Sequence, residues 1–287
     1  MVERVRERLD SLDEIGTLPQ VMARILAIVD DDSSTALDLA SEIEHDQALT
    51  TRILRTVNSS YYGFQRQIMT VPEAVVILGF NEVERLALAI SVINTLGMDR
   101  ENVVTLARLW KHSLATSMAG SQIETMRGHD PGGVEGAHVA GLLHCLGIVL
   151  IAQAVPEAAT PIHDYMRDHE CGLIEAERVV LDGISHPEIG ARVAEKWGLP
   201  EPLVNAIKFY AEPSQCPQPT PLVYATHIAH HLANKAKLGV TGIHDPFEPE
   251  AAAVEAIKLD AELEAEVLRY LERNRSIMSA VSSAAMF

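Results

Sequence analysis

The residues best able to do chemistry in this 287-residue chain are its twelve histidines. His144 differs from the rest because it lies in an apolar run, AGLLHCLGI, at residues 140–148. Burying an imidazole costs free energy unless the ring is hydrogen-bonded or bound to a metal ion. His144 is therefore either a core histidine bonded to a backbone carbonyl or a metal ligand.

Other histidines could join His144 in a site. His112 lies in WKHS, His186 lies in the first turn of a predicted helix, and His227 and His230 are three residues apart on one helical face. Spacing alone does not connect them, and each could instead be a surface residue or a residue that supports a site from outside. Three histidines in charged surroundings are predicted to be solvated: His129, His163 and His169.

The three cysteines, Cys145, Cys171 and Cys216, are widely spaced and form no CxxC pair. This pattern predicts a reducing, cytoplasmic compartment. Cys145 follows His144 directly, but successive residues of a helix point about 100° apart, which makes joint ligation of one ion less easy. A buried, inert thiol is the preferred interpretation of Cys145. The sequence contains no P-loop, dinucleotide fingerprint or GxSxG element.

A second candidate segment is NSSYYG, residues 58–63. Its polar and aromatic side chains could bind a ligand or a partner, and the candidates are Asn58, Ser59, Tyr61 and Tyr62. In the alternative interpretation, the segment ends one helix and leads to the next. The Asn and Ser side chains would then hydrogen-bond the backbone N–H and C=O groups that the helix end leaves unpaired, and the tyrosines would pack with their hydroxyl groups outward.

The elements that must position these residues are helices. Capping signals mark several predicted helix starts, and no convincing β-alternation or internal repeat occurs, so we expect an all-α fold. Gly79 suits a helix end. The start signals are Thr35 with Asp38, Thr70 with Pro72 and Glu73, Asn81 with Glu84, and Ser185 with Glu188.

The length suggests one large domain or two modest ones, at roughly 150 residues per domain. The helical pattern pauses near residues 97–100, which predicts an N-terminal helical bundle over residues 1–98 and a second helical subdomain over 99–240. Residues 241–287 are predicted to form an acidic C-terminal tail, with one or two peripheral helices at 249–274 and a frayed Ser/Ala end.

The formal charge of −17 argues against general nucleic-acid binding, because such a chain repels phosphate backbones on average. The N-terminus is charged from its third residue, unlike a signal peptide. The most apolar stretch, residues 139–155, is interrupted by His144 and Gln153 and is shorter than a comfortable membrane span of about 20 residues. We therefore expect this stretch to be a buried helix and not a membrane anchor. The net charge fits a protein that binds protein partners or small ligands.

Residues 18–239 resemble an HDOD domain, the HD-related output domain of bacterial signalling proteins. The resemblance implies an all-α fold with an N-terminal bundle packed on a subdomain similar to HD phosphohydrolases. Its N-terminal motifs are Leu18-Pro19, Asp46, Leu49-Thr50, Asn58-Ser59, Tyr61-Tyr62 and Leu78-Gly79. Its later motifs are Trp110-Lys111-His112-Ser113, Gly141-Leu142-Leu143-His144, His186-Pro187-Glu188-Ile189-Gly190 and Trp197-Gly198-Leu199-Pro200.

In HD hydrolases, a His and an adjacent His-Asp pair bind divalent metals that activate water. The resemblance places His112 at the first ligand position, His144 at the His of the pair and His186 at a downstream His. The Asp of the pair is Cys145 here, Phe209-Tyr210 replaces a pair of histidines, and His230 falls at the late Asp position. Because Mg²⁺ and Mn²⁺ prefer oxygen ligands, we expect the binuclear hydrolytic centre of the HD hydrolases to be absent here.

The resemblance implies a regulatory module of bacterial signal transduction that acts through protein partners. The missing Asp of the pair favours a non-catalytic role. Because the sequence shows no receiver, kinase or GGDEF-like segment, we expect the module to act as a stand-alone domain. The N-terminal bundle, with its groove against the HD-like part, is the expected interaction surface. No cofactor is expected. The alternatives are a residual metal-dependent phosphohydrolase of nucleotides or cyclic dinucleotides, a sensor of a nucleotide ligand, and a single Zn²⁺ or other transition metal at the relic residues. The sequence does not indicate an oligomeric state.

Overall fold

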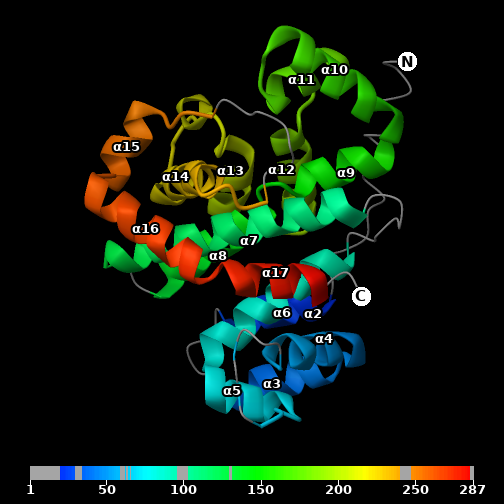
Figure 1. The fold of residues 1–287 in the computed structure, drawn as a ribbon, viewed down its shortest axis with the longest axis vertical. Helices are drawn as coiled ribbons and strands as arrows, with labels where there is room; N and C mark the ends of the chain where they lie inside the picture. The colour runs from blue at the N-terminus through cyan, green and yellow to red at the C-terminus, as the bar shows by residue number, and fades with distance from the viewer. Residues whose placement is uncertain are drawn as a thin grey trace. The chain divides into compact units, whose positions relative to one another are not determined.

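The chain is helical throughout the part that a computed structural model describes, which is residues 20–29, 34–58, 62, 64, 66–95, 103–128, 131–239 and 247–284 (Figure 1). No strand occurs among these residues, so the predicted all-α fold class is confirmed. Within them the chain divides into two compact units. Unit 1 contains His112–Glu272, and unit 2 contains Gly16–Lys111 with Arg273–Phe287.

This division differs from the expected one at two points. It falls inside a continuous helix, α7 (Val103–Met126), between Lys111 and His112, whereas the sequence pattern pauses near residues 97–100. The residues expected to form a separate tail are also shared between the units. Those up to Glu272 belong to unit 1, and those from Arg273 belong to unit 2.

Side-chain caps begin several helices where the sequence predicts them. Thr35 and Asp38 form a capping box, the Thr70 hydroxyl accepts the Glu73 N–H, and the Ser185 N–H donates to the Glu188 carboxylate at 2.6 Å. Gly79 ends its helix at φ 90°, a backbone conformation that favours glycine. The predicted cap at Asn81 is wrong, because the next helix already begins at Phe80, directly after this glycine.

Unit 2 packs short amphipathic helices around an aliphatic core, which includes Met22, Ile25, Leu39, Ile43 and Ile53. The Ser/Ala end of the chain, expected to fray, instead forms α17, because Ile277, Met278 and Val281 are buried and α17 contacts α4. The helices wholly in this unit are α2 (Gln20–Val29), α3 (Ala36–Glu44), α4 (Gln47–Val57), α5 (Val71–Leu78), α6 (Phe80–Thr95) and α17 (Arg275–Ala284).

Unit 1 contains the candidate chemical residues. Its helices after α7 are α8 (Pro131–Leu143), α9 (Leu146–Ala154), α10 (Ala159–His169), α11 (Leu173–Val180), α12 (His186–Lys196), α13 (Glu201–Phe209), α14 (Pro221–Lys235), α15 (Ala251–Ile257) and α16 (Ala261–Arg273). Short 3-10 turns lie at Pro156–Ala158 and Pro213–Gln215. α12 packs on α9 and α13, while α14 packs on α8, α13 and α15.

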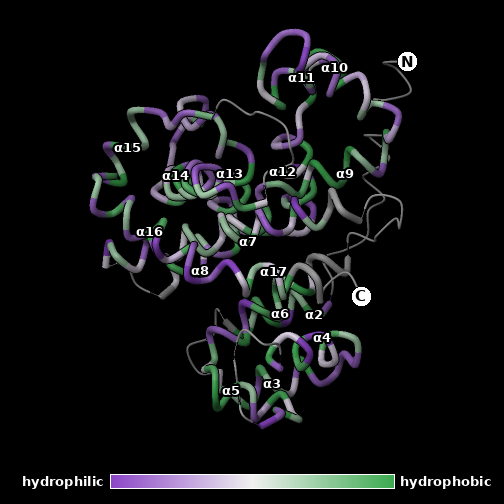
Figure 2. Tube along the Cα trace, viewed as in Figure 1, coloured by the Kyte–Doolittle hydropathy of each residue, from purple (hydrophilic) through white to green (hydrophobic). Residues whose placement is uncertain are grey.

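One helical stretch in the described part of the chain, Gly132–Ala154, is long and apolar enough to cross a membrane by composition. It corresponds to α8 and α9, and 78% of its most apolar window is buried inside the protein. Figure 2 shows hydrophobic colour concentrated along α9, whereas the region of α10 and α11 carries long hydrophilic stretches. Burial of this kind is typical of the core helix of a globular unit.

Candidate functional site: a buried imidazole–thiol cluster

Unit 1 brings together four of the residues that the sequence singles out. We call His112, His144, Cys145 and His230 the imidazole–thiol cluster. His112 comes from α7, His230 from α14, and His144 with Cys145 from the turn between α8 and α9. All four are buried, and none exposes more than 6% of its surface. A fifth candidate, His186, lies beside the cluster at the start of α12.

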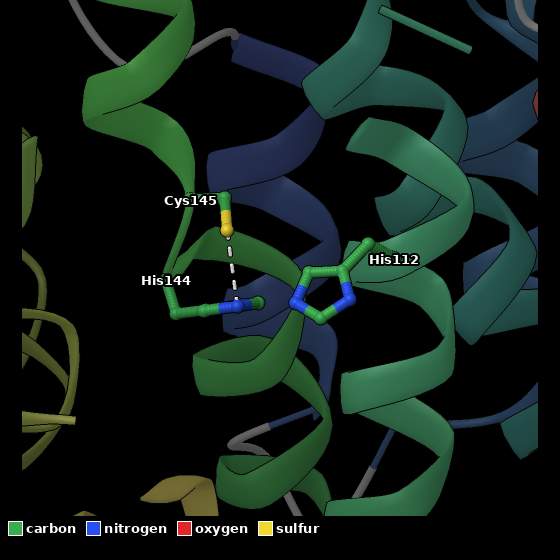
Figure 3. Close-up of side chains that lie close together, drawn as sticks. All are labelled: His112, His144 and Cys145. Carbon is green, nitrogen blue, oxygen red and sulfur yellow. Dashed lines mark hydrogen bonds between the residues drawn. The ribbon is translucent and has the colours of Figure 1, made fainter. Parts of the chain in front are cut away.

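The turn at residues 144–145 explains why neighbouring residues can face the same point. The expectation that His144 and Cys145 diverge by a helical step is wrong, because α8 ends at Leu143 and α9 begins only at Leu146. Cys145 Sγ therefore lies 3.0 Å from His144 Nε2 (Figure 3). One donor atom each from His112, His144 and Cys145 lie within 4.8 Å of one another.

Close helix contact brings these residues together. A Cβ atom on Gly141 of α8 would lie 2.5 Å from the N and Cα atoms of Ser117 on α7. Only glycine allows the two backbones to approach this closely, one turn before His144. The carbonyl of Gly141 in turn accepts the His144 Nδ1–H at 2.7 Å, which fixes the ring.

The ring nitrogens of the imidazole–thiol cluster all have hydrogen-bond partners, within the cluster or on neighbouring residues, when every ring is neutral. His144 donates from Nδ1 to Gly141, so its Nε2 is free to accept the Cys145 S–H. His112 Nδ1 lies 3.4 Å from the Leu238 carbonyl, and its Nε2 lies 3.0 Å from His230 Nδ1. His230 therefore donates from Nδ1 to His112. Its Nε2, 3.0 Å from Asn234 Nδ2, accepts from that amide.

Burial keeps these rings neutral. Desolvation lowers the pKa of His112 to about 4, even though the hydrogen bond to Leu238 opposes this change. Desolvation, with a smaller contribution from neighbouring His112, places the pKa of both His144 and His230 well below the usual value. Lone pairs of His112 Nε2 and His144 Nε2 are consequently available near neutral pH.

A second polar chain lies next to the imidazole–thiol cluster. Glu177 Oε2 accepts both the His186 backbone N–H at 2.8 Å and the His186 Nδ1–H at 2.7 Å. The Tyr210 hydroxyl lies 2.7 Å from His186 Nε2 and donates to it. The Tyr210 ring then contacts His144 edge-on and His230 at a tilt, with centroid distances of 4.7 and 5.0 Å. Glu177, Asn234 and Leu238 are members of the site that the sequence analysis missed.

Removing the Glu177 carboxylate is expected to destabilise unit 1 strongly. Glu177→Ala leaves two buried N–H groups of His186 without their acceptor, at a cost of about 3 kcal/mol in the free energy of unfolding. Glu177→Gln retains an acceptor oxygen and is expected to cost about 1 kcal/mol. Urea denaturation of the two variants measures these losses. Equal losses in the free energy of unfolding for Glu177→Ala and Glu177→Gln would contradict the acceptor role.

The remaining histidine of the α14 pair has a different position. His227 Nδ1 donates to the Tyr210 carbonyl at 2.6 Å, and its Nε2 accepts the Glu250 N–H at 2.8 Å. His227 therefore connects α14 to the end of α13 and the start of α15. Both of its ring nitrogens are used for this connection, so His227 does not join the imidazole–thiol cluster.

The segment at residues 58–63 lies in unit 2 and is described only in part. Asn58 donates to the Leu54 and Ile68 carbonyls and accepts the Ile68 N–H, each at 2.8 Å. The Tyr62 hydroxyl donates to Glu82 at 2.9 Å. The side chains of Asn58 and Tyr62 thus connect to Leu54, Ile68 and Glu82 within unit 2. Ser59 and Tyr61, the other two candidates, lie outside the described residues.

The donor set does not fit the pair of hard metal ions that HD hydrolases use. The imidazole–thiol cluster offers three imidazoles and one thiol, and none of its four members is a carboxylate. Mg²⁺ and Mn²⁺ require oxygen ligands. The neighbouring carboxylate, Glu177, already binds His186 through one oxygen, and Tyr210 occupies the position beside His186 Nε2.

Comparison with known proteins identifies the family of this chain. The HDOD domain family matches residues 15–213. An uncharacterized protein of Treponema pallidum is 27% identical over 210 residues, which cover 73% of this chain and 40% of the relative. The chain thus spans about two fifths of that curated relative's length.

Two solved structures share the fold. An HDOD domain protein of unknown function from Geobacter sulfurreducens has a TM-score of 0.78 at 23% identity, with 99% of this chain and 97% of that one covered. A protein from Shewanella amazonensis SB2B, named as a candidate phosphohydrolase, has a TM-score of 0.72 at 22% identity, with 97% of each chain covered. On the match over residues 15–213, the chain belongs to the HDOD domain family.

Proposed function

We propose that this HDOD protein is a non-catalytic regulatory module that acts in bacterial signal transduction by binding protein partners. The observation that carries the proposal is the composition of the buried site. The position next to His144 holds a thiol where a hydrolase needs a carboxylate, and the four groups of the imidazole–thiol cluster are hydrogen-bonded to one another. A site of this kind holds no oxygen donors with which to bind and orient hard, water-activating ions.

A partner surface is supported by the distribution of exposed apolar side chains. Among the described residues, seven large hydrophobic side chains are exposed, and five of these lie in unit 2 between residues 37 and 77. Val76 is 84% exposed on α5, next to Ile77, while Val71, Ala74 and Val75 of the same helix are buried. An α5 face that presents apolar groups to solvent is typical of a protein-binding surface.

The absence of hydrolysis is tested with purified protein, Mg²⁺ or Mn²⁺, and a panel of nucleotides and cyclic dinucleotides. We expect no turnover above that of buffer. Turnover that disappears in His144→Gln would overturn the proposal in favour of a residual phosphohydrolase. His144→Gln retains side-chain polarity, and its folding is checked by circular dichroism.

The partner surface is tested by quantitative affinity capture from a bacterial lysate with two matched variants. Val76→Asp alters the exposed α5 face of unit 2, whereas Val179→Asp alters an exposed valine on α11 of unit 1. We expect the wild type and Val179→Asp to capture the same specific proteins in similar amounts. Val76→Asp should capture at least about tenfold less of these proteins. Identical capture by all three proteins would contradict a role for this face.

A further inference from the structure

We propose that His112, His144, His230 and Cys145 form a single binding site for a zinc-class cation. The proposal goes beyond the regulatory function and does not depend on it. It changes the interpretation of the imidazole–thiol cluster from a relic of a hydrolytic centre to a mononuclear site of different chemistry. The ion would join α7, α14 and the α8–α9 turn, and no hydrolytic step is assigned to it.

The distances between the donor atoms carry the proposal. His230 Nδ1 lies 3.0 Å from His112 Nε2 and 3.1 Å from His144 Nε2, and Cys145 Sγ lies 3.0 Å from His144 Nε2. A tetrahedral zinc ion with usual bond lengths separates two nitrogens by about 3.3 Å, and a nitrogen from a sulfur by about 3.6 Å. These three donor pairs therefore need to part by about 0.2 to 0.6 Å to admit an ion between them.

The rings are also oriented as metal-binding histidines usually are. A ligating imidazole normally donates its other N–H to a carbonyl or carboxylate, which fixes its tautomer and direction. His144 does so to Gly141 O, and His112 does so to Leu238 O. The Nε2 lone pairs of both rings are thereby directed away from the backbone carbonyls and toward His230 Nδ1.

Loading the site requires two proton movements. The Cys145 thiol loses its proton to solvent, so that the thiolate becomes a ligand. The proton on His230 Nδ1 moves to Nε2, and the Asn234 amide turns to present its oxygen to the new N–H. The net change is the release of one proton for each zinc ion bound.

The donor types select the ion. Imidazole nitrogens with one thiolate suit Zn²⁺, whereas Mg²⁺ and Ca²⁺ are bound by oxygen. The substitution that removes the hydrolytic carboxylate therefore creates a soft ligand at the same position. Burial of all four residues shields a bound ion from solvent, as in structural zinc sites.

The test uses the full chain, stripped with a chelator and titrated separately with ZnCl₂ and CoCl₂. We expect one zinc per chain, a rise in Tm of about 5–10 °C at a hundredfold excess over Kd, and a thiolate-to-cobalt charge-transfer band. Cys145→Ser should remove the band and weaken zinc binding at least about tenfold. Cys216→Ser changes another buried cysteine, and this control should retain both properties.

The zinc stoichiometry, the rise in Tm and the cobalt band of the wild-type protein test the proposal even if Cys145→Ser folds poorly. Failure of the stripped protein to bind zinc, with no rise in Tm, would overturn the proposal. Zinc bound with a charge-transfer band that persists in Cys145→Ser would overturn it too, because the thiolate would then come from another cysteine. Neither result bears on the hydrolysis assay, so the zinc site and the proposed function can fail separately.

Discussion

Metal-free protein is expected to lose stability steeply as the pH falls from about 6.5 toward 4. Below its ordinary pKa of about 6.5, a histidine of the unfolded chain takes up a proton, while burial keeps His112 neutral in the folded protein until its pKa of about 4. The unfolded state then binds more protons, so the free energy of unfolding decreases with falling pH. Above about pH 6.5 this contribution is constant.

The size of this effect follows from the number of buried rings. Each imidazole that only the unfolded chain protonates changes the free energy of unfolding by about 1.4 kcal/mol per pH unit, which amounts to about 3 kcal/mol for His112 over its range. His144, His227 and His230 have a lowered pKa for the same reason and add to the slope. The loss can therefore approach the whole stability of an ordinary domain, which is about 5–15 kcal/mol.

Urea denaturation between pH 7.5 and 4.5, with chelator present, measures this slope. His112→Gln should reduce this slope by the equivalent of about one proton bound on unfolding. His163 is an exposed residue of α10, and His163→Gln should leave the slope unchanged. A wild-type slope close to zero between pH 6 and 5 would show that the folded rings take up protons, contrary to their burial. A slope that His112→Gln does not alter would assign the acid sensitivity to other groups.

The fold could be predicted from the sequence because its signals are local. Thr35, Thr70 and Ser185 cap helices through residues three positions away, so the pattern is complete within one turn. The division into units could not be predicted this way. It falls inside α7, where the local pattern has no break, and it depends on contacts between distant segments such as α17 and α4.

For the candidate site too, part could be predicted from the sequence and part could not. The resemblance assigns five residues to one former metal site, and the structure places all five in one buried region of unit 1: His112, His144, Cys145, His186 and His230. Their geometry could not be predicted from spacing. The approach of Cys145 to His144 depends on a helix break that no glycine or proline marks at those two positions. Glu177 was missed because a glutamate on an amphipathic helix is usually solvated, and only the tertiary contact with His186 shows its role.

The packing of α9 on α12 determines how Cys145 and His186 are positioned, and Gly147 is the point of closest approach. A Cβ atom on Gly147 would overlap the His186 carbonyl oxygen and lie 2.9 Å from the Gly190 nitrogen. Both neighbours are backbone atoms, so no side-chain rotation can relieve the overlap. A side chain at this position would separate the helix that follows Cys145 from the helix that begins at His186.

Gly147→Ala is accordingly expected to cost more than about 4 kcal/mol in the free energy of unfolding, or to prevent unit 1 from folding. The matched control is Gly136→Ala on α8, where the added Cβ would meet only the Leu222 methyl groups at 3.8 and 3.9 Å, which are ordinary contact distances. There the gain in helix propensity should stabilise the protein by up to about 1 kcal/mol. Urea denaturation of the two variants decides the matter, since a Gly147→Ala protein as stable as the control would mean that α9 and α12 do not touch at their backbones.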